Sequence, residues 1–215
     1  MTDSTVSIDQ LTAWLAHFES LLAEQQEYLT ELDDAIGDGD HGSNMARGMA
    51  AVMDKLRASS PAVAVDELFK AVGMTLVSSA GGASGPLYGT FFLRFGMNAG
   101  AAPALTAVGL AAALRAGLEG VVARGSAEIG DKTMVDALSP AIDAYDTAVA
   151  AGAGIAAAAS ASFEAAKTGR DATGPLVARK GRAGDLAERS TAHLDPGAAS
   201  TALLFEALAV SLAAK

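Results

Sequence analysis

The chain has 215 residues, the length of one domain with a sizeable core, and its net charge of −10 argues against a nucleic-acid phosphate backbone as a partner. It contains no cysteine, which excludes disulfide bonds, thiol catalysis and cysteine-ligated zinc together. Alanine supplies much of the 51% apolar content and β-branched runs are nearly absent, so we expect an all-α fold.

The start of the chain and its most apolar stretches argue against export and membrane insertion. The first ten residues carry acids and no basic segment, which argues against a signal peptide. Residues 148–163 are mostly alanine and residues 198–214 are interrupted by Glu206, so neither stretch supplies the roughly 20 strongly apolar residues of a membrane span. We therefore expect a soluble cytoplasmic protein.

About eight helices are expected along a single domain, 1–215. Ser7 and Gln10 form an S-x-x-Q capping box, and the apolar residues that follow recur at spacings of three and four as far as Asp33 or Asp34. The other predicted helices cover about 43–57, 65–79, a helix beginning after GGASGP, 106–124, 133–151, 155–168 and 196–214. Residues 169–197 are glycine-rich, basic and weakly periodic, which is typical of a functional lid or a linker.

The segment LDDAIGDGDHGSN, residues 32–44, concentrates four aspartates at the end of the first predicted helix. Asp38 and Asp40 flank a glycine, so a sharp bend would bring their carboxylates together, and Asp33 lies within reach at the helix end. Three carboxylates without thiols favour a hard cation such as Mg²⁺. An EF-hand is excluded because Met49 occupies the twelfth position, where a glutamate is required. The simpler alternative is a capped Asp-Gly turn.

A second candidate is the glycine-rich stretch SSAGGASGPLYGT, residues 78–90. Its small residues would let the backbone approach a ligand closely, and the N–H groups that open the next helix can bind phosphate. It is not a Walker A loop, since no Gly-Lys-Ser/Thr follows, and not a dinucleotide fingerprint, since no strand is expected before it. On its own, the stretch is more typical of a turn between two helices.

Two further segments and one histidine carry candidate residues. The turn GDKT, 130–133, leads into a helix, with its aspartate or threonine as the expected N-cap. In the basic segment, Arg182 suits a phosphate or nucleotide, although a solvated loop is an equal alternative. Residues 195–197 indicate a helix start with proline in the first turn. His41 adjoins the acidic cluster and would contact phosphate or accept a phosphoryl group.

Taken in order, these four segments resemble the nucleotide-binding L subunits of dihydroxyacetone kinases, a domain also found at the C-terminal end of single-chain ATP-dependent kinases. The resemblance runs from WLAHFESLLAEQQEYLTELDDAIGDGDHGSNMARGM through GMTLVSSAGGASGPLYGTFF and RGSAEIGDKTMVDAL to ARKGRAGDLAERSTAHLDPGAAS. It implies an all-α barrel of about eight antiparallel helices with the nucleotide at one end. The sequence ERSTAHLDPG is more similar to the form that depends on the phosphotransferase system. Gly184-Asp185 departs from the family's common Ser-Tyr, which bears on lid packing and partner docking.

The resemblance also implies the ligands and the residues around them. ADP, or ATP, would be held by two Mg²⁺ ions that bridge its diphosphate to Asp33, Asp38 and Asp40. The matching positions around the phosphates, the nucleotide and its lid are His41, Ser43, Asn44, Ala83, Ser84, Gly125, Met134, Arg182, Asp195, Pro196 and Gly197. Such cations would let an acidic protein bind a polyanion. No residue is assigned as catalytic.

In the phosphotransferase form, the resemblance implies that ADP stays bound as a cofactor. A phosphohistidine carrier, the M subunit, recharges it, and the phosphoryl group passes to dihydroxyacetone on a separate K subunit. A transcription regulator and a homodimer are left open as further partners, and neither nucleic acid nor a membrane is expected. The alternatives are an ATP-dependent kinase subunit for another short ketose or an acyl carboxylate, and a non-catalytic nucleotide-dependent helical binding module.

Overall fold

The structure is a computed structural model that describes residues 5–213. Its α-helices are α1 Ile8–Glu24, α2 Gln26–Ile36, α3 His41–Ala58, α4 Val65–Ser79, α5 Ser84–Ala99, α6 Ala107–Gly125, α7 Val135–Ala150, α8 Ile155–Ala172, α9 Gly181–Gly184 and α10 Pro196–Ala213. A 3-10 turn, η1, covers Ala187–Ser190, and the strands β1 Thr5–Ser7 and β2 Ala104–Thr106 pair antiparallel. The expected all-α single domain is confirmed, with one small strand pair that the sequence did not predict.

The first predicted helix is two helices in the structure. The capping box at its start is present, since Ser7 N donates to Gln10 Oε1 at 3.0 Å and Gln10 N donates to Ser7 Oγ at 3.2 Å. At Gln25 the backbone leaves helical geometry (φ −102°, ψ 11°), although Gln25 N still bonds Leu21 O and Leu29 N still bonds Gln25 O. The hydrogen-bond pattern and the apolar spacing both continue across this kink, so the sequence contains no break signal there.

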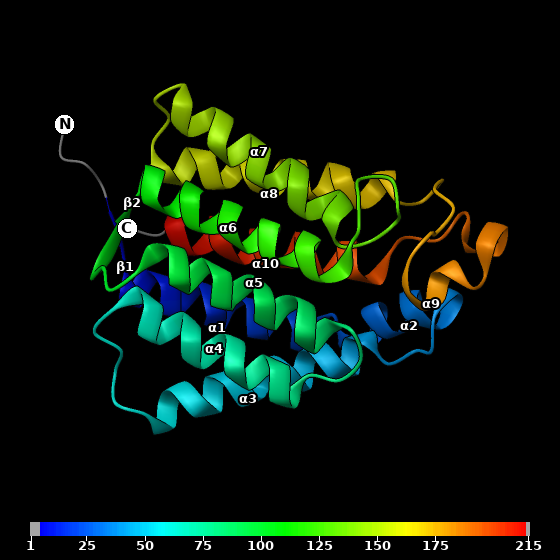
Figure 1. Cartoon of the computed structure of the whole chain (residues 1–215), viewed down its shortest axis with the longest axis horizontal. Helices are drawn as coiled ribbons and strands as arrows, with labels where there is room; N and C mark the ends of the chain where they lie inside the picture. Colours follow the sequence, from blue (N-terminus) through cyan, green and yellow to red (C-terminus); the bar gives the residue numbers. More distant parts are fainter. Residues whose placement is uncertain (1–4, 214–215) are drawn as a thin grey trace.

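The long helices pack in chain order and return to the first. Each of α3 to α7 contacts the helix that follows it, α10 packs against α8 and α1, and α1 packs against α3. Neighbours run in opposite directions, so α3, α5, α7 and α10 all begin at the end where α2 and α9 lie (Figure 1). These pairwise contacts join the long helices into a ring, and the barrel arrangement stays a prediction.

The interior is an aromatic and aliphatic core that needs close helix packing. Trp14 lies among Phe69, Phe92 and Phe95, with ring centroids 5.9 to 6.0 Å away. Its indole N–H donates to Leu204 O at 2.8 Å, so the buried polar atom is satisfied. These contacts tie α1 to α4, α5 and α10 and fix the helix ends that carry the site.

Helix α10 is long and apolar enough, by length and composition, to resemble a membrane span. However, 67% of the residues in its apolar window are buried inside the fold, as expected for a central helix of a bundle. It therefore does not indicate a membrane protein. The burial also explains why α10 lacks a polar face.

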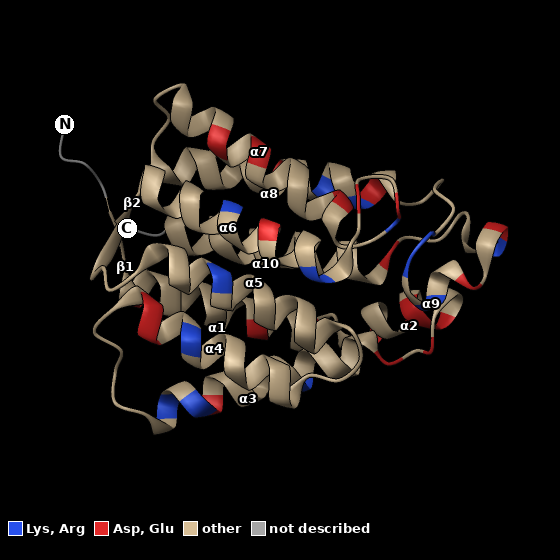
Figure 2. Cartoon of the chain, in the orientation of Figure 1, with Lys and Arg blue, Asp and Glu red and all other residues tan. Residues whose placement is uncertain are grey.

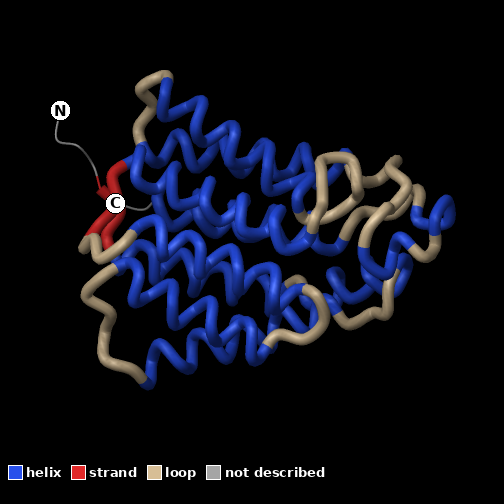
Figure 3. The backbone as a smooth tube through the Cα atoms, in the orientation of Figure 1, coloured by secondary structure: helices blue, strands red, loops and turns tan. Residues whose placement is uncertain are grey.

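The two ends of the bundle differ in structure and charge. The strand pair lies at one end, and the longer loops gather at the other (Figure 3). Acidic and basic residues lie close together along the ribbon around α2 and α9 at this loop end (Figure 2). The segment predicted as a lid, 169–197, includes the last residues of α8, the short helix α9 and the turn η1, so it is more structured than the sequence indicated.

Candidate functional site

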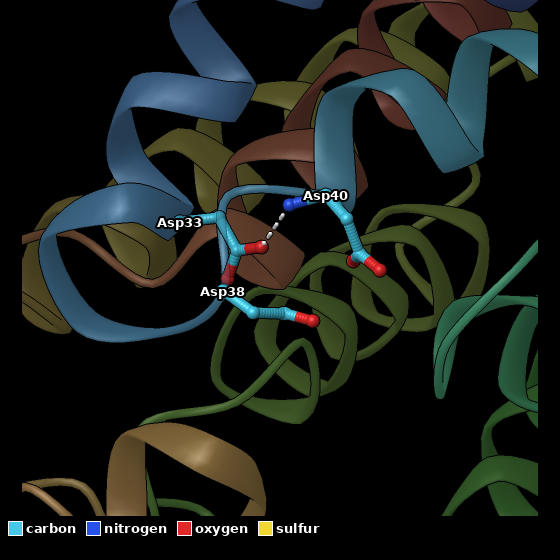
Figure 4. A group of neighbouring side chains, drawn as sticks. All are labelled: Asp33, Asp38 and Asp40. Atoms are coloured by element: carbon cyan, nitrogen blue, oxygen red, sulfur yellow. Dashed lines mark hydrogen bonds between the residues drawn. The ribbon is translucent and has the colours of Figure 1, made fainter.

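Three carboxylates meet between α2 and α3. Asp33, Asp38 and Asp40 each offer one oxygen, and these oxygens all lie within 4.8 Å of one another (Figure 4). Asp33 lies in the last turn of α2, and Asp40 is the residue before α3 begins. The fourth aspartate of the segment, Asp34, is exposed and lies outside the cluster. Three converging carboxylate oxygens suit a hard divalent cation completed by phosphate oxygens or water.

The turn that carries the cluster is fixed by backbone hydrogen bonds and by two glycines. Asp33 Oδ2 accepts from Asp40 N at 2.9 Å and from His41 N at 3.0 Å, so this carboxylate bonds the open N-terminus of α3. A β-carbon at Gly37 would lie 2.1 Å from Asp33 Oδ1, and Gly39 has a φ of +71°. The Asp-Gly turn of the simpler alternative is therefore real, and it positions the carboxylates.

The electrostatics of the cluster favour a bound cation. Burial raises the pKa of Asp33, and the neighbouring carboxylates Asp38 and Asp40 raise it further, while its backbone hydrogen bonds act in the opposite direction. A cation between the three groups would relieve both the repulsion and the loss of hydration. The residues present therefore fit Mg²⁺ by ligand chemistry.

The carboxylates open onto a cavity of about 550 Å³ at the loop end of the bundle. The first residues of four helices line it, namely His41 of α3, Ser84 of α5, Val135 of α7 and Pro196 of α10. Helix N-termini present unpaired N–H groups and partial positive charge, which suit an anion such as phosphate. The cavity therefore joins a cation site to an anion site.

Most residues predicted for the site line this cavity. The structure brings together Asp33, Asp38, Asp40, His41, Ala83, Ser84, Gly125, Met134, Arg182, Asp195, Pro196 and Gly197. Ser43 and Asn44 do not line it: Ser43 Oγ donates to Asp40 O at 2.9 Å, and Asn44 Oδ1 accepts from Arg47. A β-carbon at Gly81 would lie 2.4 Å from Asn44 Oδ1, so Asn44 packs under the glycine-rich turn. Both residues thus support the two turns, and a direct ligand contact for them stays a prediction.

His41 is held in one orientation by hydroxyl groups. Ser200 Oγ donates to Gly197 O at 3.1 Å, so its oxygen accepts from His41 Nε2 at 2.9 Å and from the Tyr88 hydroxyl at 2.8 Å. His41 Nδ1 is then the acceptor for Ser84 Oγ at 3.0 Å. Burial lowers the pKa of His41 to about 4, so the ring is neutral at pH 7. Because both ring nitrogens form hydrogen bonds within the protein, the geometry favours a role for His41 in contacting phosphate over a role as phosphoryl acceptor.

The opposite wall of the cavity is basic. Arg182 of α9 forms an ion pair with Asp38, so the long loop reaches back across the cavity to the acidic cluster. Arg124 and Lys180 line the same space. Guanidinium groups bind phosphate oxygens through a planar fork, so this wall complements a polyphosphate held at the carboxylates.

A family comparison matches these features to known proteins. The model of the DAK2 domain matches residues 35–210, which is most of the chain. The chain belongs to the DAK2 domain family. The match spans α3 to α10, so it covers the helix starts that line the cavity.

Relatives with this domain are named as kinase subunits. The chain is 42% identical over 210 residues to the PEP-dependent dihydroxyacetone kinase ADP-binding subunit DhaL of Escherichia coli K12, covering 96% of this chain and 98% of that one. It is 43% identical over 203 residues to the PTS-dependent DhaL of Lactococcus lactis, covering 94% and 97%.

A solved structure shares the fold. The dihydroxyacetone kinase of C. freundii, in complex with AMP-PNP and Mg²⁺, matches with a TM-score of 0.72 and 31% identity. The match covers 94% of this chain and 34% of that kinase, so the DAK2 domain corresponds to about a third of the longer protein.

Sequence reasoning missed two buried charged groups of this DAK2 domain near the start of α7. Asp136 and Thr133 together organise the start of α7: Asp136 accepts from Gly130 N at 2.5 Å and from Thr133 N at 2.7 Å, and Thr133 Oγ1 accepts from Val135 N at 3.2 Å. Lys132 of that turn is buried and donates to backbone carbonyls. The sequence shows that this turn contains charged residues, but it does not show which groups their side chains contact.

Asp195 was predicted as part of a helix start, and the structure adds its burial. Its carboxylate caps α10 by accepting from Ala198 N at 2.7 Å. Burial raises the pKa of Asp195 to about 7. A carboxyl group that titrates near neutrality beside the cavity is therefore a feature that the sequence alone could not indicate.

Proposed function

We propose that this chain is the ADP-binding subunit of a dihydroxyacetone kinase that receives its phosphoryl group from a phosphohistidine carrier. The observation that carries the proposal is the cluster of Asp33, Asp38 and Asp40 facing a cavity lined by four helix N-termini. Identities of 42% and 43%, over nearly the full length of subunits named for binding ADP, support the same conclusion.

In this proposal the three aspartates would hold two Mg²⁺ ions, which would bind the diphosphate of ADP or ATP. Bound Mg²⁺ would neutralise charge on the transferring phosphoryl group. The N–H groups at the start of α5 would bind phosphate oxygens, and the neutral ring of His41 would lie beside them without adding charge. The count of two ions follows from the family resemblance alone, whereas nucleotide and Mg²⁺ together are supported by the complex of the C. freundii kinase with AMP-PNP and Mg²⁺.

The loop that carries Arg182 acts as a lid in this proposal. Arg182 contacts the acidic cluster directly, and the walls formed by Gly125, Met134 and the turn 195–197 would enclose the nucleotide. A closed lid excludes water, which prevents hydrolysis of the transferring group. The protein thereby supplies positioning and electrostatics, which carry most of the catalysis in phosphoryl transfer.

The partners follow from the same reaction. A K subunit would hold dihydroxyacetone and an M subunit would deliver the phosphoryl group, as the words PEP-dependent and PTS-dependent in the relatives' names suggest. These subunits would meet in the cytoplasm. A transcription regulator and a homodimer remain further proposals, with the departure at Gly184-Asp185 lying on the lid surface where a partner would approach.

Reconstitution tests this function. The chain is mixed with a K subunit, an M subunit, the general phosphotransferase proteins, Mg²⁺, ADP in catalytic amount and dihydroxyacetone. We expect product formation that requires phosphoenolpyruvate and this chain. Equal turnover with ATP alone, without the M subunit, would instead establish an ATP-dependent kinase. Mg²⁺-dependent nucleotide binding without turnover under either condition would establish a non-catalytic module.

A further inference from the structure

The loop between α8 and α10 closes on itself at its base. Ala192 N donates to Gly174 O at 2.9 Å, and Asp195 N donates to Thr173 Oγ1 at 3.0 Å. The two ends of the loop therefore lie together next to the cavity. Everything between them, including Arg182, projects from this base and is called here the basic loop, residues 174–194.

A single buried ammonium group joins both ends of the basic loop. Lys132 is 1% exposed, and its side chain comes from the turn before α7. Its Nζ donates to the carbonyl oxygens of Thr173 at 2.8 Å, Gly174 at 3.4 Å, Leu176 at 3.1 Å and His193 at 2.6 Å. An ammonium group has three N–H donors, and four carbonyls share them. None is left for a ligand, so Lys132 acts on the loop.

The contact of Lys132 with the loop carbonyls requires an unfavourable backbone conformation at Lys132 itself. Lys132 has a φ of 62°, in the left-handed region that a β-carbon disfavours. The carbonyls of Thr173 and Gly174 follow the C-terminus of α8, where the helix dipole favours a positive charge. The same turn binds the loop a second time, because Arg179 N donates to Asp131 O at 3.0 Å.

The part of the basic loop that carries Arg182 is tied together by one buried hydrogen bond, which Ala178 N donates to Ser190 Oγ at 2.8 Å, and is otherwise mostly exposed. Helix α9 is four residues long and buries none of them, and the Arg182 side chain is 67% exposed. A short exposed helix does not fix a long side chain by itself. The place of Arg182 above Asp38 therefore depends on how the base of the loop is held.

We propose that Lys132 is a positioning residue, whose ammonium group clamps the base of the basic loop and so sets the reach of Arg182 to the carboxylate cluster. Its effect on nucleotide binding rests on the proposed function, whereas its effect on the loop does not. The clamp links the turn before α7 to the lid, so the cavity wall around Met134 and the lid are held as one unit.

Hydrogen exchange of the full chain without nucleotide tests the clamp. We compare the wild type with Lys132→Met, which keeps the length of the side chain but removes its charge and donors. The matched control is Lys167→Met, which removes a lysine of α8 that pairs with Glu164 on the surface. In Lys132→Met we expect amides in 177–192 to exchange about tenfold faster or more, and no change in the control. Unchanged exchange in this segment would overturn the proposal.

A double-mutant cycle then tests whether Lys132 acts through Arg182. The affinity for ADP in Mg²⁺ is measured for the wild type, Lys132→Met, Arg182→Ala and the double variant. We expect Arg182→Ala to weaken binding about tenfold in the wild type and by less than about twofold in Lys132→Met. Additive losses would show a merely structural lysine and overturn the proposal.

Two safeguards keep these outcomes separate. If circular dichroism shows that Lys132→Met does not fold, Lys132→Gln, which retains two N–H donors, is carried through both measurements with the same criteria. If the wild type shows no Mg²⁺-dependent ADP binding, the proposed function fails, and the exchange comparison alone decides whether Lys132 clamps the loop.

Discussion

The turn that carries the three clustered aspartates, residues 33–40, is called here the acidic turn. It faces the basic loop across one cavity, yet the two segments are held in different ways. The acidic turn is short, lies between two helices and is fixed locally, because Asp33 accepts two N–H groups at the start of α3. The basic loop is long and is held at its base by contacts distant in sequence, with Lys132 reaching His193 across 61 positions.

This difference corresponds to two tasks, the binding of cations by the acidic turn and the closure of the cavity by the basic loop. A site for cations needs ligand atoms at fixed distances, which a glycine turn between helix ends supplies. A lid needs to open and close, so it is better supported at its base than along its length. The two walls of the cavity should therefore respond differently to substitution: changes in the acidic turn should abolish binding, and changes in the basic loop should weaken it.

The largest effect is expected at the acidic turn itself. Asp38→Asn removes one carboxylate of the cluster, and we expect Mg²⁺-dependent ADP retention to fall by on the order of 100-fold or more. Because Asp38 is exposed, the helical circular dichroism should stay intact. Asp34→Asn, a neighbouring exposed aspartate outside the cluster, is the matched control and should bind ADP as the wild type does. A variant at Asp38 that still retains ADP would show that the metal-ligand assignment is wrong.

A smaller effect is expected from the glycines that shape the turn. A β-carbon at Gly37 would meet Asp33 Oδ1 at 2.1 Å, whereas one at Gly39 would meet the exposed Asp34 at 2.0 Å. Gly37→Ala should therefore displace a cluster carboxylate and weaken Mg²⁺ binding about tenfold. Gly39→Ala should cost mainly stability, about 1 kcal/mol, because its φ is +71°. Calorimetric titration with Mg²⁺ and thermal unfolding separate the two, and equal Mg²⁺ affinities would contradict the geometry.

The smallest effect on binding is expected at Asp195, whose burial instead makes stability depend on pH. Its folded pKa of about 7 lies above the ordinary value of 3.8, so its contribution is favourable at low pH and is lost as the pH rises to about 7. Asp195→Asn keeps an acceptor for Ala198 N and should unfold with the same free energy as the wild type near pH 4. Near pH 8 it should be more stable by on the order of 3 kcal/mol.

Denaturant unfolding across pH measures that difference directly. Taking the difference between the two proteins cancels the opposite slope expected from His41, whose lowered pKa costs stability as the pH falls from about 6.5 towards 4. A difference that does not change with pH would show that folding does not raise the pKa of Asp195.

How far the sequence predicted this molecule depends on the range of the contacts involved. Helix positions and the three-aspartate cluster follow from spacing, glycines and caps within a few residues, as the confirmed capping box at Ser7 and Gln10 illustrates. The kink at Gln25 had no local signal, because the apolar stripe of α1 continues into α2.

The basic wall of the cavity was only partly predictable for the same reason. Arg182 was identified by its type and by family resemblance, but its partner Asp38 lies far away in sequence. Lys132 was one residue of the predicted turn GDKT, and only the folded chain shows its side chain buried among four carbonyls. Buried charges that serve long-range contacts carry no periodic signal, so the sequence could not assign them.

Native mass spectrometry of the purified chain tests the central claim most directly, because it detects bound ADP and Mg²⁺ together. We expect ADP that survives dialysis in Mg²⁺ and is released by a chelator, since the carboxylate cluster binds the diphosphate only through cations. A chain that carries no nucleotide and shows no Mg²⁺-dependent binding of added ADP would contradict the account.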